Sequence, residues 1–502
     1  MEAKLKIAEE FAFAAVDSRL YGSFVEHLGR IIYGGIYDPE SPDSDEKGFR
    51  KDVIQAVKGL NTPIIRYPGG NYVSNYRWED SVGPVEKRPK KIDLSWKSIE
   101  PNIVGLAEFE AWAKKVDSSI NMAVNLGTRG IEDARNLIEY CNFDGDSYYA
   151  NLRRKHGHPE PYKFKTWCLG NEMDGSWQVG HKDAVEYGKL ANEVAKAMKT
   201  VDDSIELVVC GSSGLEMDTF GDWELKVLEE CYENVDFLSL HQYYGNEEDD
   251  LENYLAKSEG MDRFISGVTA ICDAVKAKKK TDKTINLSFD EWNIWYHFKG
   301  EEEANKNWSV APHLLEEIYN FEDALVIGCL LITLLKHADR VKIACLAQLV
   351  NVLAPIMTEE NGEMWRQTTY FPFAQVSNYG KGKVLTPYVA VDTYDCKEWK
   401  NVKKVETIAV LNEESKELVV FAVNRSREMC RFSVDSLDIP LDFVVQFSEM
   451  EGFDIKQTNS VQNEMVIPKD SENIVIEDNS ISAVLQPLSW NMIRIKIQES
   501  FF

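Results

Sequence analysis

Short apolar runs recur through the first three quarters of the chain, and stretches with helical spacing lie between them. The runs lie at residues 20–25, 63–67, 121–125, 166–169, 207–211, 237–240, 285–289 and 343–347. Alternation of this kind is typical of parallel strands joined by crossover helices. Eight strand–helix units predict an α/β protein built on a (β/α)8 TIM barrel, which we place at residues 17–380.

The segments between the apolar runs carry the pattern of amphipathic helices. In 109–116 and 184–198 the apolar residues are three to four positions apart, as they are on one face of a helix. The most apolar segment, 324–335, is too short to span a bilayer, so we interpret it as a buried helix.

After about residue 380 the helical spacing stops and strand alternation takes over. Segment 418–425 follows a polar turn, and segment 493–497 alternates strictly between apolar and charged residues. This pattern predicts a C-terminal antiparallel β-sandwich, jelly-roll-like, at residues 381–502. Residues 3–7 alternate in the same way, so we expect residues 1–16 to add a strand to that sandwich.

Polar residues follow the predicted barrel strands. They are Glu26 and His27, Gly69 to Asn71, Asn171 and Glu172, His241 to Tyr243, Glu291 and Trp292, and Gln348. In a TIM barrel the chemistry is built at the carboxyl ends of the strands. We therefore expect these side chains to converge on one cleft.

Glu172 and Glu291 are the candidate catalytic residues. They lie 291 − 172 = 119 residues apart, which is three strand–helix units and places them on the fourth and seventh strands. Hydrolysis of a glycosidic bond uses such a pair, one group to donate a proton and the other to attack the sugar. For either residue alone, a solvated surface acid is the simpler interpretation, because the chain contains 83 acidic residues.

Composition narrows the class of protein. The net charge is −27, which opposes binding to nucleic acid or to an anionic membrane. The nine cysteines include no Cys-x-x-Cys pair, so we interpret them as buried thiols of a reducing compartment. No secretory signal is visible at the start of the chain, and we expect a cytoplasmic protein. His27 and His241 lack metal-ligand spacing, so we expect neither a metal nor a cofactor.

Several motifs together resemble a known family. They are Tyr21-Gly-Ser-Phe-Val-Glu-His-Leu-Gly-Arg30, Arg66-Tyr-Pro-Gly-Gly-Asn-Tyr-Val-Ser74, Trp167-Cys-Leu-Gly-Asn-Glu-Met-Asp-Gly175, Ser239-Leu-His-Gln-Tyr-Tyr-Gly245, Asp290-Glu-Trp-Asn-Ile-Trp-Tyr296, Gln348-Leu-Val-Asn-Val-Leu-Ala-Pro355 and Trp365-Arg-Gln367. The chain is similar in these motifs to the α-L-arabinofuranosidases of glycoside hydrolase family 51. The likeness covers nearly the whole barrel, whereas the tail is matched by architecture more than by motif.

The resemblance implies a retaining enzyme that removes terminal α-L-arabinofuranosyl units from arabinan, arabinoxylan or their oligosaccharides. It implies that Glu172 is the general acid/base and Glu291 the nucleophile. It assigns sugar binding to Glu26, Asn71, Asn171, Tyr243 and Gln348, with Trp96 and Trp295 as walls. Assembly into a homo-oligomer is also expected. Ser176 and segment 101–105 depart from the family pattern and bear on substrate preference.

Other residues are given supporting roles from their chemistry. A nucleophilic Glu291 must be ionised, and a nearby cation lowers its pKa; Arg66, near the end of the second strand, is our candidate, with an ordinary ion pair as the alternative. We expect His241 to be a hydrogen-bonded supporting residue and Tyr243 to donate to Glu291. We expect the pKa of Glu172 to be raised while Glu291 is charged.

Three other functions share part of this pattern. The same carboxylate geometry serves other retaining glycosidases, such as an endo-glucanase or a xylosidase, which would need a through-groove lined by aromatic residues. A non-catalytic carbohydrate-binding protein would keep both glutamates only by coincidence. A metabolic barrel enzyme would normally show a phosphate-binding glycine loop after the seventh or eighth strand, and the sequence has none there.

Overall fold

The computed structural model describes residues 1–297 and 308–501. Its centre is a closed barrel of eight strands in the order β3-β4-β7-β8-β9-β10-β11-β12, and neighbouring strands pair in parallel. The strands are β3 (Gly22–Phe24), β4 (Ile64–Tyr67), β7 (Ser119–Val124), β8 (Thr166–Leu169), β9 (Glu206–Val209), β10 (Phe237–Tyr244), β11 (Asn286–Ile294) and β12 (Val341–Ala347). The eight predicted strands and the TIM-like barrel are confirmed.

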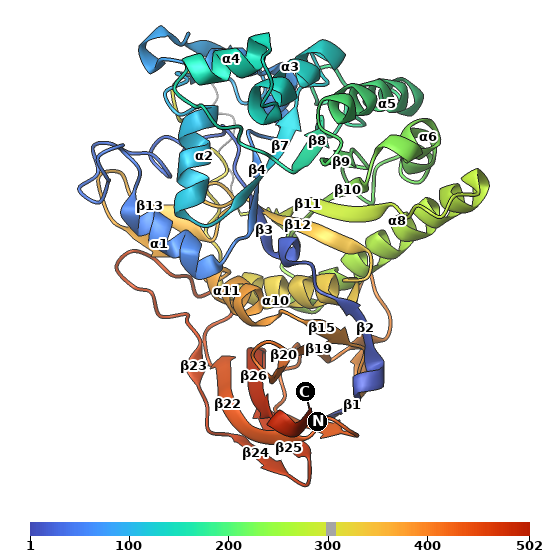
Figure 1. The fold of residues 1–502 in the computed structure, drawn as a ribbon. Coiled ribbons are helices and arrows are strands. Elements are labelled where there is room, and N and C mark those ends of the chain that lie inside the picture. Colours follow the sequence, from blue (N-terminus) through green and yellow to red (C-terminus); the bar gives the residue numbers. More distant parts are fainter. Residues whose placement is uncertain (298–307, 502) are drawn as a thin grey trace.

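Helices surround the barrel (Figure 1). They are α1 (Lys51–Leu60), α2 (Leu106–Lys115), α3 (Ile131–Asn142), α4 (Tyr148–Lys155), α5 (Ala184–Val201), α6 (Asp222–Cys231), α7 (Leu251–Leu255), α8 (Lys257–Lys279), α10 (Phe321–Lys336) and α11 (Tyr370–Tyr379). The predicted helices 109–116 and 184–198 correspond to α2 and α5. Helix α5 begins where the Asp183 side chain accepts a hydrogen bond from Glu186 N, a typical N-cap.

Two further β-sheets combine strands β1 and β2, which precede the barrel in the chain, with strands that come after it. The first has the order β16-β1-β21-β25-β24 and the second β2-β15-β19-β20-β26-β22-β23. Their strands are β1 (Glu2–Ile7), β2 (Ala12–Ala15), β15 (Lys383–Leu385), β16 (Tyr388–Val391), β19 (Val405–Asn412), β20 (Glu417–Asn424), β21 (Cys430–Ser436), β22 (Leu441–Met450), β23 (Lys469–Asp470), β24 (Ile474–Glu477), β25 (Ser480–Leu485) and β26 (Ser489–Ile497). Short hairpins pair β5 (Lys91–Asp93) with β6 (Ser98–Glu100), β13 (Ile356–Thr358) with β14 (Met364–Arg366), and β17 (Thr393–Tyr394) with β18 (Val402–Lys403).

The two sheets enclose a hydrophobic core of their own, to which both contribute, so the predicted C-terminal antiparallel sheet domain is confirmed. Pairing is antiparallel except between β1 and β21, which run parallel. Thus the N-terminal strand β1 lies between β16 and β21, two strands from the last quarter of the chain. The boundaries 1–16, 17–380 and 381–502 stay a prediction.

Helix α10 contains the apolar segment 324–335. It lies between the barrel and the second sheet (Figure 1). A Cβ atom at Gly328 would stand 2.5 Å from the Trp490 ring, so a glycine allows the sheet to approach the helix. Beside this contact, buried Arg425 donates to Ser258 Oγ at 2.6 Å and pairs with Glu406 at 3.2 Å. Within the described ranges, no helix is both long enough and apolar enough to cross a membrane.

Candidate active site

The carboxyl ends of the barrel strands surround a cavity of about 520 Å³. Eight of the residues predicted from the sequence line it: Glu26, Asn71, Trp96, Glu172, Tyr243, Glu291, Trp295 and Gln348. They come from the ends of β3, β4, β8, β10, β11 and β12 and from the loop between β5 and β6. These eight residues therefore converge on one site as expected, whereas His27, Gln242 and Trp292, expected there too, are not among the described residues that line the cavity. The described residues that line the cavity include neither Ser176 nor any residue of 101–105.

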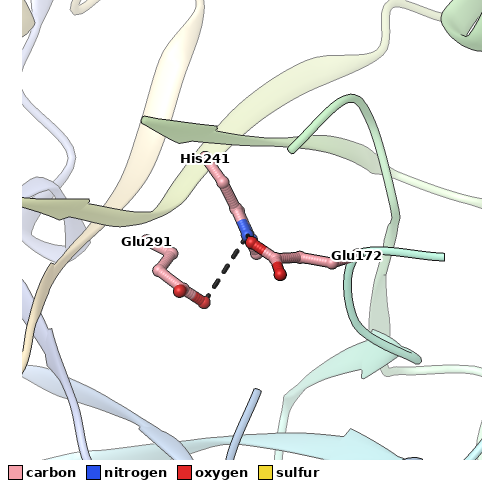
Figure 2. A group of neighbouring side chains, drawn as sticks. All are labelled: Glu172, His241 and Glu291. Carbon is pink, nitrogen blue, oxygen red and sulfur yellow. Dashed lines mark hydrogen bonds and ion pairs between the residues drawn. The ribbon is translucent and has the colours of Figure 1, made fainter. Parts of the chain in front are cut away.

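Glu172 and Glu291 face each other across this cavity. Three atoms, one side-chain oxygen of each glutamate and a ring nitrogen of His241, all lie within 4.8 Å of one another (Figure 2). Both glutamates are only 8% exposed. Retaining glycosidases hold their two carboxyl groups about 5 Å apart, and inverting ones hold them farther apart to admit a water.

Glu291 is held at both oxygens. Arg66 Nη1 donates to Oε2 at 2.8 Å, and the Tyr243 hydroxyl donates to Oε1 at 2.8 Å. Arg66 is fully buried, with its guanidinium over the Phe24 ring. A charge-assisted hydrogen bond of this kind favours the ionised carboxylate. The sequence-predicted cation and phenol thus lie where a nucleophile needs them.

Glu172 has different surroundings. His241 Nδ1 lies 3.0 Å from its Oε1, and Trp177 Nε1 donates to its Oε2 at 2.7 Å. Burial and then the charge of Glu291 raise the pKa of Glu172, against these two hydrogen bonds. The residue has a φ of +43°, a left-handed conformation that costs energy for a residue with a Cβ and is often found at functional sites. The raised pKa of Glu172 is what a proton donor requires.

His241 lies among three carboxylates. Its Nδ1 is 3.0 Å from Glu172 Oε1 and 3.5 Å from Glu291 Oε2, and its Nε2 is 2.9 Å from Asp290 Oδ1. Burial alone would lower the pKa of His241, but the charge of Glu291 and the hydrogen bonds to Asp290 and Glu172 raise it to about 10. These contacts favour the protonated ring, in which both N–H groups would donate to carboxylates.

A chain of amides runs beside the carboxylates. Arg66 Nη2 donates to Asn171 Oδ1 at 2.6 Å, and Asn171 Nδ2 donates at 3.3 Å to Asn71 Oδ1 and to Gln178 Oε1. Asn171 itself is not one of the described residues that line the cavity. A Cβ atom at Gly70 would stand 3.2 Å from Asn171 Oδ1 and 3.3 Å from Glu291 Oε2. The absence of a side chain at Gly70 leaves room for this chain of contacts.

Glu26 is another residue of the cavity wall. It accepts hydrogen bonds from Tyr72 N at 2.8 Å, Trp96 Nε1 at 3.1 Å and Gln348 Nε2 at 3.3 Å. Burial raises its pKa, the Tyr72 N–H opposes that shift, and the charge of Glu291 adds to it, giving about 8. Glu26 is therefore protonated at neutral pH and holds an O–H donor at the cavity wall.

Sequence reasoning missed several residues here. Trp177, five positions after Glu172, lines the cavity and contacts the acid directly; with Trp96 and Trp295 it provides a third indole. Ser95, Ser213 and the apolar Leu28, Leu315 and Leu353 also line the cavity. Asp290 was quoted in a motif but given no role. The sequence signal for Asp290 is its place next to Glu291, and no comparable signal marks Trp177.

The cluster also has the spacing of a metal site, because Glu172, His241 and Glu291 each offer an atom within the 4.8 Å group. The charges argue against a cation here. Arg66 already lies against Glu291, and a protonated His241 has no lone pair for a metal. The prediction that no metal takes part stays a prediction.

Two buried carboxylates side by side at the carboxyl end of a TIM-like barrel define the class of protein: a barrel glycoside hydrolase. Sequence models narrow this class. Residues 56–261 match the model of the α-L-arabinofuranosidase 1 domain, and residues 290–489 match that of the α-L-arabinofuranosidase C-terminal domain.

Characterised relatives agree with these models. The chain is 53% identical to an intracellular exo-α-(1→5)-L-arabinofuranosidase 1 of Bacillus subtilis over 99% of both chains. It is 54% identical to an intracellular exo-α-(1→5)-L-arabinofuranosidase of Acetivibrio thermocellus, over 98% of this chain and 99% of that protein. A family 51 α-L-arabinofuranosidase from Bifidobacterium longum superposes with a TM-score of 0.93 at 41% identity, covering 98% and 99% of the two chains. The chain belongs to the family 51 α-L-arabinofuranosidases, and the predicted family and enzyme class are confirmed.

Proposed function

We propose that this α-L-arabinofuranosidase releases terminal arabinofuranosyl units from arabinan oligosaccharides with retention of configuration. The main support is the distance of at most 4.8 Å between oxygens of Glu172 and Glu291 in one cavity. That spacing leaves no room for a water between the sugar and a base. The relatives named for exo-α-(1→5) activity favour the 1→5 linkage for this chain.

In the first step, Glu291 attacks the anomeric carbon while the glycosidic C–O bond breaks, and the leaving oxygen takes the proton of Glu172. Arg66 and Tyr243 hold the attacking carboxylate in place. Formation of the ester removes the charge of Glu291, so the pKa of Glu172 falls. In the second step Glu172, now ionised, takes a proton from water, and that water displaces Glu291 from the sugar.

The remaining contacts give the cavity its selectivity for a small sugar. Glu26, Asn71 and Gln348 present polar atoms to it, and Trp96, Trp177 and Trp295 provide apolar walls. A furanose has few hydroxyl groups, which suits a compact cavity with a few fixed polar groups. An endo-glucanase or xylosidase reading lacks such support, because the relatives are arabinofuranosidases along their whole length.

The proposed place of action is inside the cell, in line with the names of the relatives. Arabinose-containing oligosaccharides would then be the substrates. Assembly into a homo-oligomer stays a prediction.

The test is hydrolysis of 4-nitrophenyl α-L-arabinofuranoside with azide as an external nucleophile. We expect Glu172→Ala to be revived by azide with formation of the α-azide, and Glu291→Ala to form only the β-azide. Exposed Glu193→Ala is the control and should match wild type. If wild type ignores arabinofuranosides but cleaves xylan or glucan, the substrate is wrong; if azide gives the opposite anomers, the two roles are exchanged.

A further inference from the structure

Asp290 and Glu291 are consecutive in β11, yet both side chains point to the inside of the barrel. Asp290 contacts residues of β4, β8 and β10, and Glu291 contacts β4 and β10. Successive residues of a regular strand point to opposite faces. The pairing of β11 shifts register with β10 between Ser239 and His241, and with β12 between Phe289 and Trp292. An irregularity of this kind re-aims a side chain, and here it adds a second carboxylate behind the first.

Asp290 is enclosed by donors. His241 Nε2 lies 2.9 Å from Oδ1, and Cys168 Sγ donates to Oδ2 at 3.4 Å. Arg66 Nε lies 3.9 Å from Oδ2. The residue is 1% exposed and is not among the described residues that line the cavity. Asp290 therefore does not reach a bound sugar, and any role in the reaction passes through its neighbours.

Both of its charged neighbours contact the catalytic pair. Arg66 reaches from Asp290 to Glu291 Oε2, and His241 reaches from Asp290 to Glu172 Oε1. If the only proton of a neutral His241 were on Nε2, facing Asp290, its Nδ1 lone pair would face Glu172. With both nitrogens protonated, Nδ1–H donates to Glu172. The form of the ring thus decides whether the acid/base receives a hydrogen bond.

We propose that Asp290 is a positioning residue that holds His241 in its doubly protonated form, with Nδ1–H directed at Glu172, and steadies Arg66 against Glu291. This assignment rests on the proposed function, since it gives Asp290 its effect through the acid/base and the nucleophile. Arg66, and after it His241, outweigh burial and hold the pKa of Asp290 below its usual value. An ionised Asp290 in turn stabilises the imidazolium.

The direct test is the protonation state of His241. Selective ¹⁵N-histidine labelling reports both ring nitrogens, and His241→Gln identifies the signal by its loss. In wild type we expect an imidazolium from pH 5 to 9, whatever substrate the enzyme takes. In Asp290→Asn we expect the ring to titrate inside that range. A neutral His241 at pH 8 in wild type overturns the proposal without any variant, and so does an imidazolium that persists to pH 9 in Asp290→Asn.

Kinetics provide the second readout. Asp290→Asn should lower kcat by about 10²- to 10⁴-fold, as loss of a histidine-orienting carboxylate does in other hydrolases, with KM changed by less than about threefold. The loss should be larger on an arabino-oligosaccharide than on the nitrophenyl substrate, because the poorer leaving group depends more on Glu172. An equal loss on both substrates contradicts the assignment.

The matched control is Asp262→Asn. Asp262 accepts a hydrogen bond from His337 Nε2 at 2.8 Å, but at the surface. This variant removes a histidine-bound aspartate and should leave kcat, KM and the His241 signal unchanged. In a double-mutant cycle, Asp290→Asn should add less than its own full loss to the loss caused by His241→Gln, because the part that acts through the His241 ring is already gone and only the contact with Arg66 is left to lose. Additive losses contradict the proposal. If the wild type is inactive but its His241 stays an imidazolium from pH 5 to 9 and titrates in Asp290→Asn, the function is refuted and the Asp290–His241 coupling stands.

Discussion

Two groups of interacting charges, each with buried members, differ in balance between acids and bases. In the active-site network, three carboxylates (Glu172, Asp290 and Glu291) share two cations, Arg66 and His241. In the helix–sheet network, which joins helices α8 and α10 to the second sheet, two carboxylates (Glu259 and Glu406) face two cations, Lys336 and Arg425. The active-site network also opens into the cavity, which both Glu172 and Glu291 line.

The difference shows how burial of the same residue types leads to different results. A balanced group satisfies each charge, and it holds two parts of the chain together. In the acid-rich group, burial and then the charge of Glu291 raise the pKa of one carboxyl, that of Glu172. A raised pKa is a cost to stability that chemistry can use.

The largest expected effect comes from Glu291→Gln. Activity on the nitrophenyl arabinofuranoside should fall by about 10⁴- to 10⁶-fold, as for loss of a nucleophile in other enzymes. Stability should nevertheless stay equal or rise by about 1 kcal/mol, because one carboxylate leaves an acid-rich group. Initial rates and urea unfolding measure both. A strongly destabilised variant would show that loss of the ion pair with Arg66 outweighs the relief of repulsion between the carboxylates.

Glu406→Gln should have the opposite effect. Arg425 and Lys336 would lose a buried partner, which costs about 3–5 kcal/mol, while kcat per folded molecule stays at the wild-type value. Thermal unfolding and active-site titration separate the two quantities. The exposed pair Lys383 and Glu413 offers the control, since Glu413→Gln should change stability by less than about 1 kcal/mol. Equal effects of the two variants would contradict the balance argument.

Acid should weaken the helix–sheet network. Burial raises the pKa of Glu406, but Lys336 and Arg425 together lower it by more than burial raises it. The pKa in the folded protein therefore lies below the usual value. The contribution of Glu406 to stability is therefore complete above about pH 4.3, the unfolded value, and is lost as the pH falls through the folded pKa. Wild type should lose more stability than Glu406→Gln in this range. Parallel pH curves for the two proteins would show that Glu406 is not the group responsible.

A smaller effect is expected at Glu26. With a pKa of about 8, this residue loses its O–H donor above that pH, so KM should rise by up to tenfold per pH unit. Glu26→Gln should have a higher KM at pH 7 and little further change up to pH 9. Steady-state kinetics from pH 6 to 9 measure both curves. A wild-type KM that is flat across this range would assign Glu26 a structural role.

The smallest effect is expected from chelators. Dialysis against EDTA, followed by assay with and without added Zn²⁺ or Mn²⁺, should leave kcat within experimental error of the untreated enzyme. The reason is that Arg66 and protonated His241 already supply the positive charge at the pair. A loss of activity that metal restores would instead assign Glu172, His241 and Glu291 to a metal.

The barrel could be predicted because its strands are largely apolar and buried on both faces, as in β8, whose four residues are all buried. The site could be predicted in outline because carboxyl ends of barrel strands share one edge. Trp177 could not, since a turn with Glu172 at positive φ brings it back to the acid. Asp290 depends on an irregular register in β11, which no periodicity in the sequence reveals.

The pairing of β1 with β16 and β21 has a consequence for synthesis of the chain. Residues 2–7 leave the ribosome before their partners at 388–391 and 431–436, which are made about 20 to 90 s later at ordinary translation rates. During that interval the strand's hydrogen-bonding edge has no native partner in the chain. A newly made N-terminal segment is thus exposed to chaperones or to other nascent chains until the last quarter of the protein emerges.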